Sequence, residues 1–404
     1  MSASRSTTSL GPGRPARQQS LRDHNLALAL RFVSEAASPV SRAQIAAATG
    51  LTRATSSTLV ELLLAGGLLT ETALLTAQGS GRPAIGLALA PGGLAGLGLE
   101  INVDYLAVTV ANLTGEVVLR EVVDGDQRGR SPDVVLTAAA RLAASALAKA
   151  HRRGLRVAGI AVSVPGLVRE GGLVRAPNLG WYDVDVLAAL RRHPSVAALD
   201  LSIDNEANDA ARSEVTAELR SFLFVSGEIG VGAGIVLDGV VFRGTRGWAG
   251  ELGHVNVDPA GPRCSCGAHG CLEMVAGLEA VTLAAGLTPT QGPPHGVALA
   301  AAAEAGHSAT LSALEAAAEA LATALGGALH LLDVGTVVLG GAYARLAPWL
   351  IPTLTGCLQE RLLWSSWEAP DVRPAAQAAE AASLGGARAV VARLLSEPGR
   401  WLVT

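Results

Sequence analysis

The sequence predicts an α/β protein in which a small helical head, residues 1–90, precedes a larger body. In the body, apolar strands alternate with Ala- and Leu-rich helices, and Gly clusters follow several strands. This order is typical of α/β folds with ligand loops at the strand ends. Charge divides at the same boundary, since the head has eight Arg and four acidic residues and the rest has 23 basic and 31 acidic residues. A basic head favours nucleic-acid binding there.

Length and composition exclude several classes of protein. At 404 residues the chain is too long for one ordinary domain, and 50% hydrophobic residues suffice for sizeable cores. Residues 1–19 offer little to bury, so we expect a flexible arm rather than a signal peptide. The uncharged stretch Ala280–Ala303 is interrupted by Gly, Pro, Gln and His and does not predict a membrane span. We expect a cytoplasmic protein with no membrane partner.

Residues 20–90 predict a winged helix-turn-helix domain. After a first helix from Leu21, Ser41 is a natural N-cap and Gly50 a natural left-handed residue at the end of a short second helix. Thr52 can cap a third helix, which Gly66 ends. Two short helices with a tight Gly turn between them have the spacing of a helix-turn-helix. A three-helix interaction module with a solvated polar face is the alternative.

Two short strands follow, Leu68–Thr76 and Ile85–Leu89, and the polar loop Ala77–Pro83 between them is the expected wing. Ser56 lies on the core side of the third helix, so we expect its hydroxyl either to bond back into that helix or to remain unsatisfied. Arg reads guanine, and hydroxyl groups suit phosphates. The residues expected to contact double-stranded DNA are Arg42, Thr52, Arg53, Thr55, Ser57, Thr58 and Arg82.

The body begins with a hairpin and continues as strands and helices in turn. Its glycine-rich run Gly227–Gly234 stands between two strands and is expected to form a loop. The expected strands are Leu106–Asn112, Val117–Val122, Val157–Val164, Phe222–Ser226, Ile235–Leu237 and Thr336–Leu339, and the long helices are Pro132–His151 and Leu311–Leu332.

Three of the four cysteines, Cys264, Cys266 and Cys271, lie within eight residues, and His254 precedes them by ten. Three thiolates and one imidazole complete a tetrahedral zinc site with no open position, so we expect a structural Zn²⁺. Gly beside the ligands allows the chain to fold tightly around an ion. His269 is an alternative ligand that the loop would point outward. Cys357 stands alone as a small apolar residue.

The body resembles the ROK family (repressors, open reading frames and sugar kinases) over nearly its whole length. The specific matches are GELGH followed by CSCGAHGCLE, within Gly250–Glu273. Further matches are VPGLV, APNLGW, DNEANDAARSE, GEIGVGAGIVLDGVVFRG and VVLGG, between Val164 and Gly341. The resemblance implies an actin-like (ribonuclease H-like) fold of two lobes, with a sugar in the cleft. A helix-turn-helix head before such a body is similar to the family's repressors of sugar metabolism.

The same resemblance predicts the domain boundaries. The arm is residues 1–19 and the DNA-binding head is 20–90. Lobe 1 is 91–210 plus 386–404, and lobe 2, with the zinc site, is 211–385. We expect the linker near Ala90–Gly93 to transmit a movement of the lobes to the head in a homodimer or homotetramer.

By resemblance, six residues surround the sugar: Asn178, Asn205, Glu206, Glu251, His254 and Glu273. Carboxylates and amides suit adjacent hydroxyl groups, and a zinc-bound His holds its second ring nitrogen in a fixed orientation. The alternative for Glu251 and Glu273 is support of the metal alone.

Two of three elements expected for phosphoryl transfer are altered. The family's kinases hold ATP phosphates with an Asp-x-Gly-Gly-Thr loop, whereas Glu100–Asp104 lacks both glycines. The Thr position holds the carboxylate of Asp104, which we expect to repel a phosphate. Glu206 replaces the kinases' general base Asp, and its longer side chain displaces the carboxylate. The second glycine loop, Gly230–Gly234, remains. No catalytic residue is therefore assigned, and the domain is expected to be a non-enzymatic sensor.

The leading hypothesis is a sugar-responsive DNA-binding repressor of carbohydrate metabolism. A ROK-type, ATP-dependent sugar kinase with a DNA-binding head is the second, and a phosphosugar- or protein-binding scaffold is the third. The sequence does not determine the sugar, the direction of its effect, the operator, the oligomer size or whether nucleotide binds.

Overall fold

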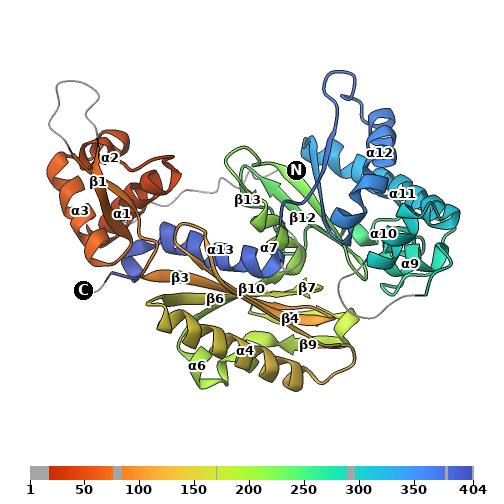
Figure 1. The fold of residues 1–404 in the computed structure, drawn as a ribbon, viewed down its shortest axis with the longest axis horizontal. Helices are drawn as coiled ribbons and strands as arrows, with labels where there is room; N and C mark the ends of the chain where they lie inside the picture. Colours follow the sequence, from red (N-terminus) through yellow and green to blue (C-terminus); the bar gives the residue numbers. More distant parts are fainter. Residues whose placement is uncertain (1–17, 76–83, 170, 289–295, 378–380, 403–404) are drawn as a thin grey trace, which may run out of the picture. The chain divides into compact units, whose positions relative to one another are not determined.

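The computed structural model describes residues 18–75, 84–169, 171–288, 296–377 and 381–402 (Figure 1). It contains two compact units, Met1–Ala90 with Arg393–Thr404, and Pro91–Ala392. Residues 393–404 therefore group with the head, whereas the sequence analysis placed them in lobe 1. Most of the expected arm, the expected wing loop and Arg82 lie outside the described residues. Within the described ranges, no helix combines the length and the apolar character that crossing a bilayer requires.

The head consists of three helices and a two-stranded antiparallel sheet. In the described part of this unit, the bounds are α1 (Gln18–Glu35), α2 (Arg42–Thr49), α3 (Arg53–Ala65), β1 (Leu69–Leu75) and β2 (Ala84–Leu89). Val40 adds an antiparallel bridge to Leu87 of β2. The C-terminal turn Pro398–Arg400 packs against α1. Buried Leu30, Ile45 and Leu63 contribute one residue from each helix to the core.

Local capping explains the helix bounds in the head. Ser41 caps α2 in a capping box with Gln44, and Gly50 ends the helix at φ 70°. The Thr52 side chain accepts from the Thr55 amide at the start of α3. These three predicted caps are confirmed.

Ser56 differs from the prediction. Its side chain is fully buried, and its hydroxyl donates to the backbone oxygen of Arg42 at 3.1 Å. The bond therefore joins α3 to α2 instead of returning into α3. A small polar residue is accommodated at this core position because the neighbouring helix offers an acceptor.

Lobe 1 of the body is a five-stranded mixed sheet in the order β10-β6-β3-β4-β5. Helices α4 and α13 lie on opposite faces of this sheet (Figure 1). A small antiparallel sheet, β7-β8-β9, extends the lobe, and Trp181 on β9 is fully buried. The strands are β3 (Leu94–Ile101), β4 (Tyr105–Asn112), β5 (Val117–Asp124), β6 (Arg156–Val164), β7 (Leu167–Val168), β8 (Leu173–Ala176), β9 (Trp181–Asp185) and β10 (Asp200–Asn205). The helices are α4 (Pro132–Arg152), the 3-10 turn Pro177–Leu179, α5 (Val186–Arg191), α6 (Pro194–Ala197) and α13 (Ala381–Ser396).

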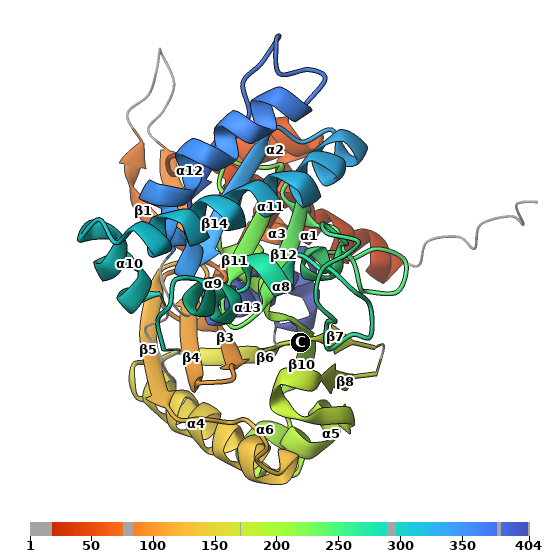
Figure 2. The same cartoon turned by 90° about the vertical axis from the view of Figure 1, so that its right-hand side faces the viewer.

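Lobe 2 is a second five-stranded sheet in the order β13-β12-β11-β14-β15, with α11 and α12 over one face (Figure 2). The strands are β11 (Phe222–Gly227), β12 (Val231–Leu237), β13 (Val240–Val241), β14 (Thr336–Gly341) and β15 (Asp371–Pro374). The helices are the 3-10 turn Leu252–His254, α8 (Glu273–Ala276), α9 (Leu278–Ala284), α10 (Val297–Glu304), α11 (Ser308–Leu332) and α12 (Ala342–Arg361). The expected body strands and long helices are confirmed, apart from the start of β12.

The glycine run before β12 is strand rather than loop from Val231 onward. A Cβ at Gly234 would lie 2.6 Å from the backbone oxygen of Ala207 and from the Cβ of Ala211, both on helix α7 (Glu206–Ser213). A Cβ at Gly232 would lie 3.2 Å from that of Ala207. These glycines therefore allow α7 to approach β12 at backbone contact distance.

Helix α13 approaches β3 in the same way. A Cβ at Gly98 would lie 1.8 Å from the backbone oxygen of Ser383 and 2.7 Å from the amide nitrogen of Ala387. Both atoms belong to the helix backbone, so neither can turn away as a flexible side chain could. Any side chain at this position must displace the helix.

We predict that Gly98→Ala destabilises the body by about 1–3 kcal/mol through overpacking. Gly327→Ala is the matched control, because it lies within α11 with nothing within 4 Å of the added Cβ, and Ala is favoured over Gly in a helix by about 1 kcal/mol. Thermal unfolding of the full chain should show a lower midpoint for Gly98→Ala and an unchanged or higher one for Gly327→Ala. Equal midpoints would contradict the packing argument.

Candidate functional site

A group of four metal-type ligands lies at the surface of lobe 2. The ligand atoms of His254, Cys264, Cys266 and Cys271 all lie within 4.8 Å of one another. The Cys266 and Cys271 sulfurs are 3.6 Å apart, and Cys264 Sγ is 3.7 Å from His254 Nδ1. Tetrahedral Zn²⁺ with bonds of about 2.3 Å to sulfur needs sulfurs about 3.8 Å apart. The residues therefore fit a four-coordinate metal ion.

Glycines shape the chain around these ligands. Gly267 has φ 97°, in a turn closed by its amide donating to Cys264 O at 3.0 Å. A Cβ at Gly270 would lie 1.5 Å from the backbone oxygen of Asp258. His269 is exposed, is not among the grouped ligands, and has Nδ1 3.3 Å from Gly261 O. As the sequence analysis expected, it points away from the group.

The metal-type group lies next to two carboxylates. Glu251 immediately precedes the turn that holds His254, and its Oε2 is 3.9 Å from His254 Nε2. Glu273 begins α8, two residues after Cys271. Since His254 directs Nδ1 to the cysteines, its Nε2 side is left toward Glu251. Fixing this loop therefore fixes both carboxylates.

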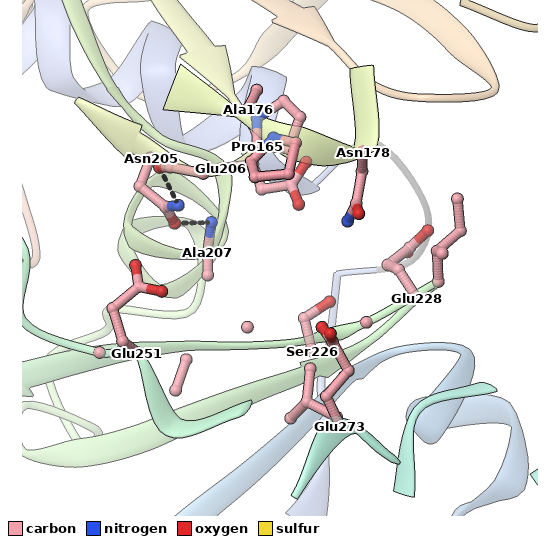
Figure 3. A pocket seen from close by; sticks show the side chains of 18 of the residues that line it. Pro165, Ala176, Asn178, Asn205, Glu206, Ala207, Ser226, Glu228, Glu251 and Glu273 are labelled. Atoms are coloured by element: carbon pink, nitrogen blue, oxygen red, sulfur yellow. Dashed lines mark hydrogen bonds between the residues drawn. The ribbon is translucent and has the colours of Figure 1, made fainter. Parts of the chain in front are cut away.

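All six residues expected around a sugar line one cavity of about 120 Å³ in the body. Roughly 10–15 Å³ suffices for one water, so the space is comparable with a small polar molecule. Asn178, Asn205 and Glu206 lie on one side, and Glu251 and Glu273 lie on the other (Figure 3). The structure thus brings together the residues that the family resemblance selected.

Asn205 is held by its own backbone environment. Its side-chain oxygen caps α7 by accepting from the Ala207 amide at 2.8 Å, and its side-chain nitrogen donates to Gly166 O at 2.9 Å (Figure 3). Both contacts fix the amide plane at the cavity wall. A side chain restrained in this way can offer its remaining donor and acceptor capacity with little loss of entropy.

Glu206 brings a buried carboxyl group to the cavity wall. Its Oε2 is buried and has no hydrogen-bond partner among the described residues. Burial, followed by the negative charges of Glu228 and Glu100, raises the pKa of Glu206 well above its usual value. A carboxyl group in this environment favours the neutral form, which can donate a hydrogen bond.

The Asp104 side chain does not line the cavity. We expected its carboxylate to repel a phosphate, but the side chain is buried and receives two hydrogen bonds from Arg128, at 2.6 and 3.2 Å. Its role is to bind the Arg128 guanidinium.

Among the lining residues that sequence reasoning missed are four polar ones: Asn102, Ser226, Glu228 and Ser265. Glu228 follows β11 directly, so its position at the carboxyl end of a strand was the signal that could have identified it. Behind it, a smaller cavity of about 30 Å³ is lined by Glu100, Glu206 and Glu228. Glu100 accepts from Tyr105 Oη at 2.6 Å and from the Ser383 amide at 3.0 Å.

The residues of the head that are expected to contact DNA differ in whether their side chains are exposed and free of ion pairs. Arg42 forms ion pairs with Glu61 at 2.7 Å and Glu71 at 3.1 Å, so its guanidinium joins α2 to α3 and β1. Arg53 is exposed at the start of α3 and has no ion pair within the described part of the chain. The hydroxyl groups of the outer face are exposed or half-buried: Thr52, Thr55, Ser57 and Thr58.

Comparisons with known proteins agree with this architecture. The xylose repressor of Bacillus subtilis (strain 168) is 28% identical over 249 residues, which cover 60% of this chain. The chain spans 63% of the length of that repressor. A solved ROK family transcriptional regulator, a homologue of the E. coli MLC protein, is 25% identical, with a TM-score of 0.78 over 93% of this chain and 97% of that one. A ROK hexokinase from Thermus thermophilus is 29% identical, with a TM-score of 0.60 over 76% of this chain and 98% of that one.

The family model described as the ROK family matches residues 96–393, which include both lobes and the metal-type group. The two solved relatives share the two-lobed α/β fold described above. Because the match spans most of the chain, this protein belongs to the ROK family.

Proposed function

We propose that this chain is a sugar-responsive transcriptional regulator that represses genes of carbohydrate metabolism. The observation that carries the proposal is the body cavity, in which three Asn and four Glu side chains surround a space of monosaccharide size, in a chain whose head has the helices of a helix-turn-helix. Amides and carboxylates are the groups that recognise adjacent hydroxyls. The likeness to a named xylose repressor and to a ROK transcriptional regulator supports the same conclusion.

The head supplies the DNA-binding surface in this proposal. The Ser41 and Thr52 caps, the Gly50 turn and the Ser56 bond to α2 fix two helices in the arrangement of a helix-turn-helix. The exposed start of α3 presents Arg53, which can read guanine in a major groove. Arg42 contributes less, since two carboxylates already engage it.

We propose that the body binds a sugar without phosphorylating it. The position of a kinase's general base is occupied by Glu206, whose longer side chain displaces the carboxylate from where an Asp would hold it. Two glycines of the expected second phosphate loop, Gly232 and Gly234, pack β12 on α7. We therefore assign no catalytic residue.

A structural Zn²⁺ is proposed at His254, Cys264, Cys266 and Cys271. Three sulfurs and one nitrogen match zinc in ligand type and number, and they leave no open position for a reacting water. Bound zinc would hold the loops of Glu251 and Glu273 at the cavity wall. These two carboxylates and His254 are then the sugar contacts of lobe 2, with Asn178, Asn205 and Glu206 those of lobe 1.

Regulation follows as a population shift in a homodimer or homotetramer. A sugar that binds one arrangement of the lobes more tightly favours that arrangement by the ratio of its two affinities. Paired heads read two half-sites at a fixed spacing, so a change in the body alters operator affinity.

The proposed function predicts sugar binding without phosphoryl transfer. At least one monosaccharide in a thermal-shift screen should raise the unfolding midpoint of the full chain and change its affinity for DNA. In the same preparation, ATP and Mg²⁺ should yield no sugar phosphate. Turnover at roughly 1–100 s⁻¹, typical of kinases, would establish the sugar-kinase alternative.

The metal assignment predicts about one equivalent of zinc per chain. Cys266→Ser should lose most of the metal and lower the unfolding midpoint, because metal binding contributes to folding. Cys357→Ser is the matched control, since Cys357 lies on α12 away from the grouped ligands. Elemental analysis showing zinc unchanged in Cys266→Ser would exclude this ligand set.

The recognition-helix assignment predicts that Arg53→Ala weakens binding to selected DNA by about 1–3 kcal/mol and relaxes base preference at one position. Arg31→Ala is the control within the head, because Arg31 lies on α1 paired with Glu35. Fluorescence anisotropy would use duplexes selected from a random pool by the unaltered protein. Full affinity in Arg53→Ala would place base reading elsewhere in the head.

A further inference from the structure

Acidic side chains contribute to the lining of the site cavity and of the smaller cavity behind it. Four carboxylates line the larger cavity: Glu206, Glu228, Glu251 and Glu273. Glu100 joins Glu206 and Glu228 around the smaller one. No Arg or Lys is among the described residues that line either space. In Figure 3 the labelled acids approach the open centre from both sides.

We infer that the effector is an unphosphorylated monosaccharide and that the pocket rejects phosphate esters of the same sugar. This inference rests on the proposed function and specifies its ligand class. A phosphate monoester carries a charge of about −1.5 to −2 and is bound in proteins by Arg, Lys or free backbone amides. Here the ester would meet carboxylates and no cationic side chain. A neutral sugar brings only hydroxyl groups, which donate to the same carboxylates.

The backbone offers little compensation for a phosphate. The start of α7 faces the cavity, and a helix N-terminus attracts anions. This helix already carries Glu206 and Asp209 in its first turn, and its Ala207 amide is taken by the Asn205 side chain. At the start of α13, the Ser383 amide is taken by Glu100. Side chains of the protein itself therefore occupy these two helix-start amides.

Zinc would not reverse the sign of the charge. One Zn²⁺ with three thiolates and a neutral imidazole has a net charge of −1. His254, when it holds the metal through Nδ1, offers Nε2 as a donor rather than as a cation. The sum at the cavity stays negative with or without the metal.

Glu206 provides a contact that favours binding of the free sugar. Its buried Oε2 lacks a partner within the described residues, and Glu228 and Glu100 lie close enough to disfavour a second ionised group. A protonated carboxyl donates one hydrogen bond to a sugar oxygen and accepts another. A bound hydroxyl group would supply the partner that the protein does not.

Binding of paired ligands to the full chain tests the inference. Calorimetry would compare D-glucose, D-mannose and N-acetyl-D-glucosamine with the 6-phosphate of each, and D-xylose would be included as a pentose. We expect at least one free sugar to bind, and its 6-phosphate to bind about tenfold or more weakly. Glu228→Gln removes a charge at nearly constant shape, so it should reduce the ratio between the dissociation constants of the 6-phosphate and the free sugar. Glu315→Gln, at an exposed position on α11, should leave this ratio unchanged.

The outcomes distinguish a failure of this inference from a failure of the proposed function. A 6-phosphate that binds as tightly as its free sugar, or more tightly, would overturn the present inference and leave sugar sensing intact. A preference for the free sugar that Glu228→Gln does not narrow would also overturn it, because the discrimination would not arise from these carboxylates. If no sugar binds in either form, the proposed sensor function itself fails.

Discussion

The site depends on the close contact between helix α7 and strand β12. Gly234 permits it, because any Cβ there would meet the Ala207 backbone oxygen at 2.6 Å. Helix α7 begins directly after β10 of lobe 1 and packs on the sheet of lobe 2. The joint between the two sheets therefore carries Asn205 and Glu206 at its leading end, so the ligand-facing residues and the contact between lobes belong to one element.

This arrangement has an energetic cost that a ligand can relieve. A buried acceptor without a partner costs about 1–3 kcal/mol. Glu206 bears such a cost beside Glu228 and Glu100. Trp181 Nε1 is also buried without a partner among the described residues, but Trp181 does not line the cavity, so of these two groups a ligand there can satisfy only Glu206. The same residue that weakens the empty protein thus selects for a hydrogen-bonding ligand.

Local signals in the sequence predicted the local structure well. The Ser41 and Thr52 caps, and the close grouping of Cys266 with Cys271, each depend on residues a few positions apart. The errors concern partners distant in sequence. The carboxylate of Asp104 is neutralised by Arg128, and the Ser56 hydroxyl finds an acceptor on the preceding helix. Neither pairing follows from spacing, because both require knowledge of how separate elements fold together.

The glycine-rich run Gly227–Gly234 also has a role that the sequence alone does not determine. Glycines after a strand predict a phosphate loop as readily as they predict close packing, since both need a missing side chain. The distinction lies in Glu228, which belongs to the run and whose carboxylate lines both cavities. A carboxylate that faces a bound phosphate would repel it, whereas a strand packed on α7 tolerates the same side chain. The charge beside the glycines, more than the glycines themselves, therefore favours the proposed sugar sensor over a nucleotide site.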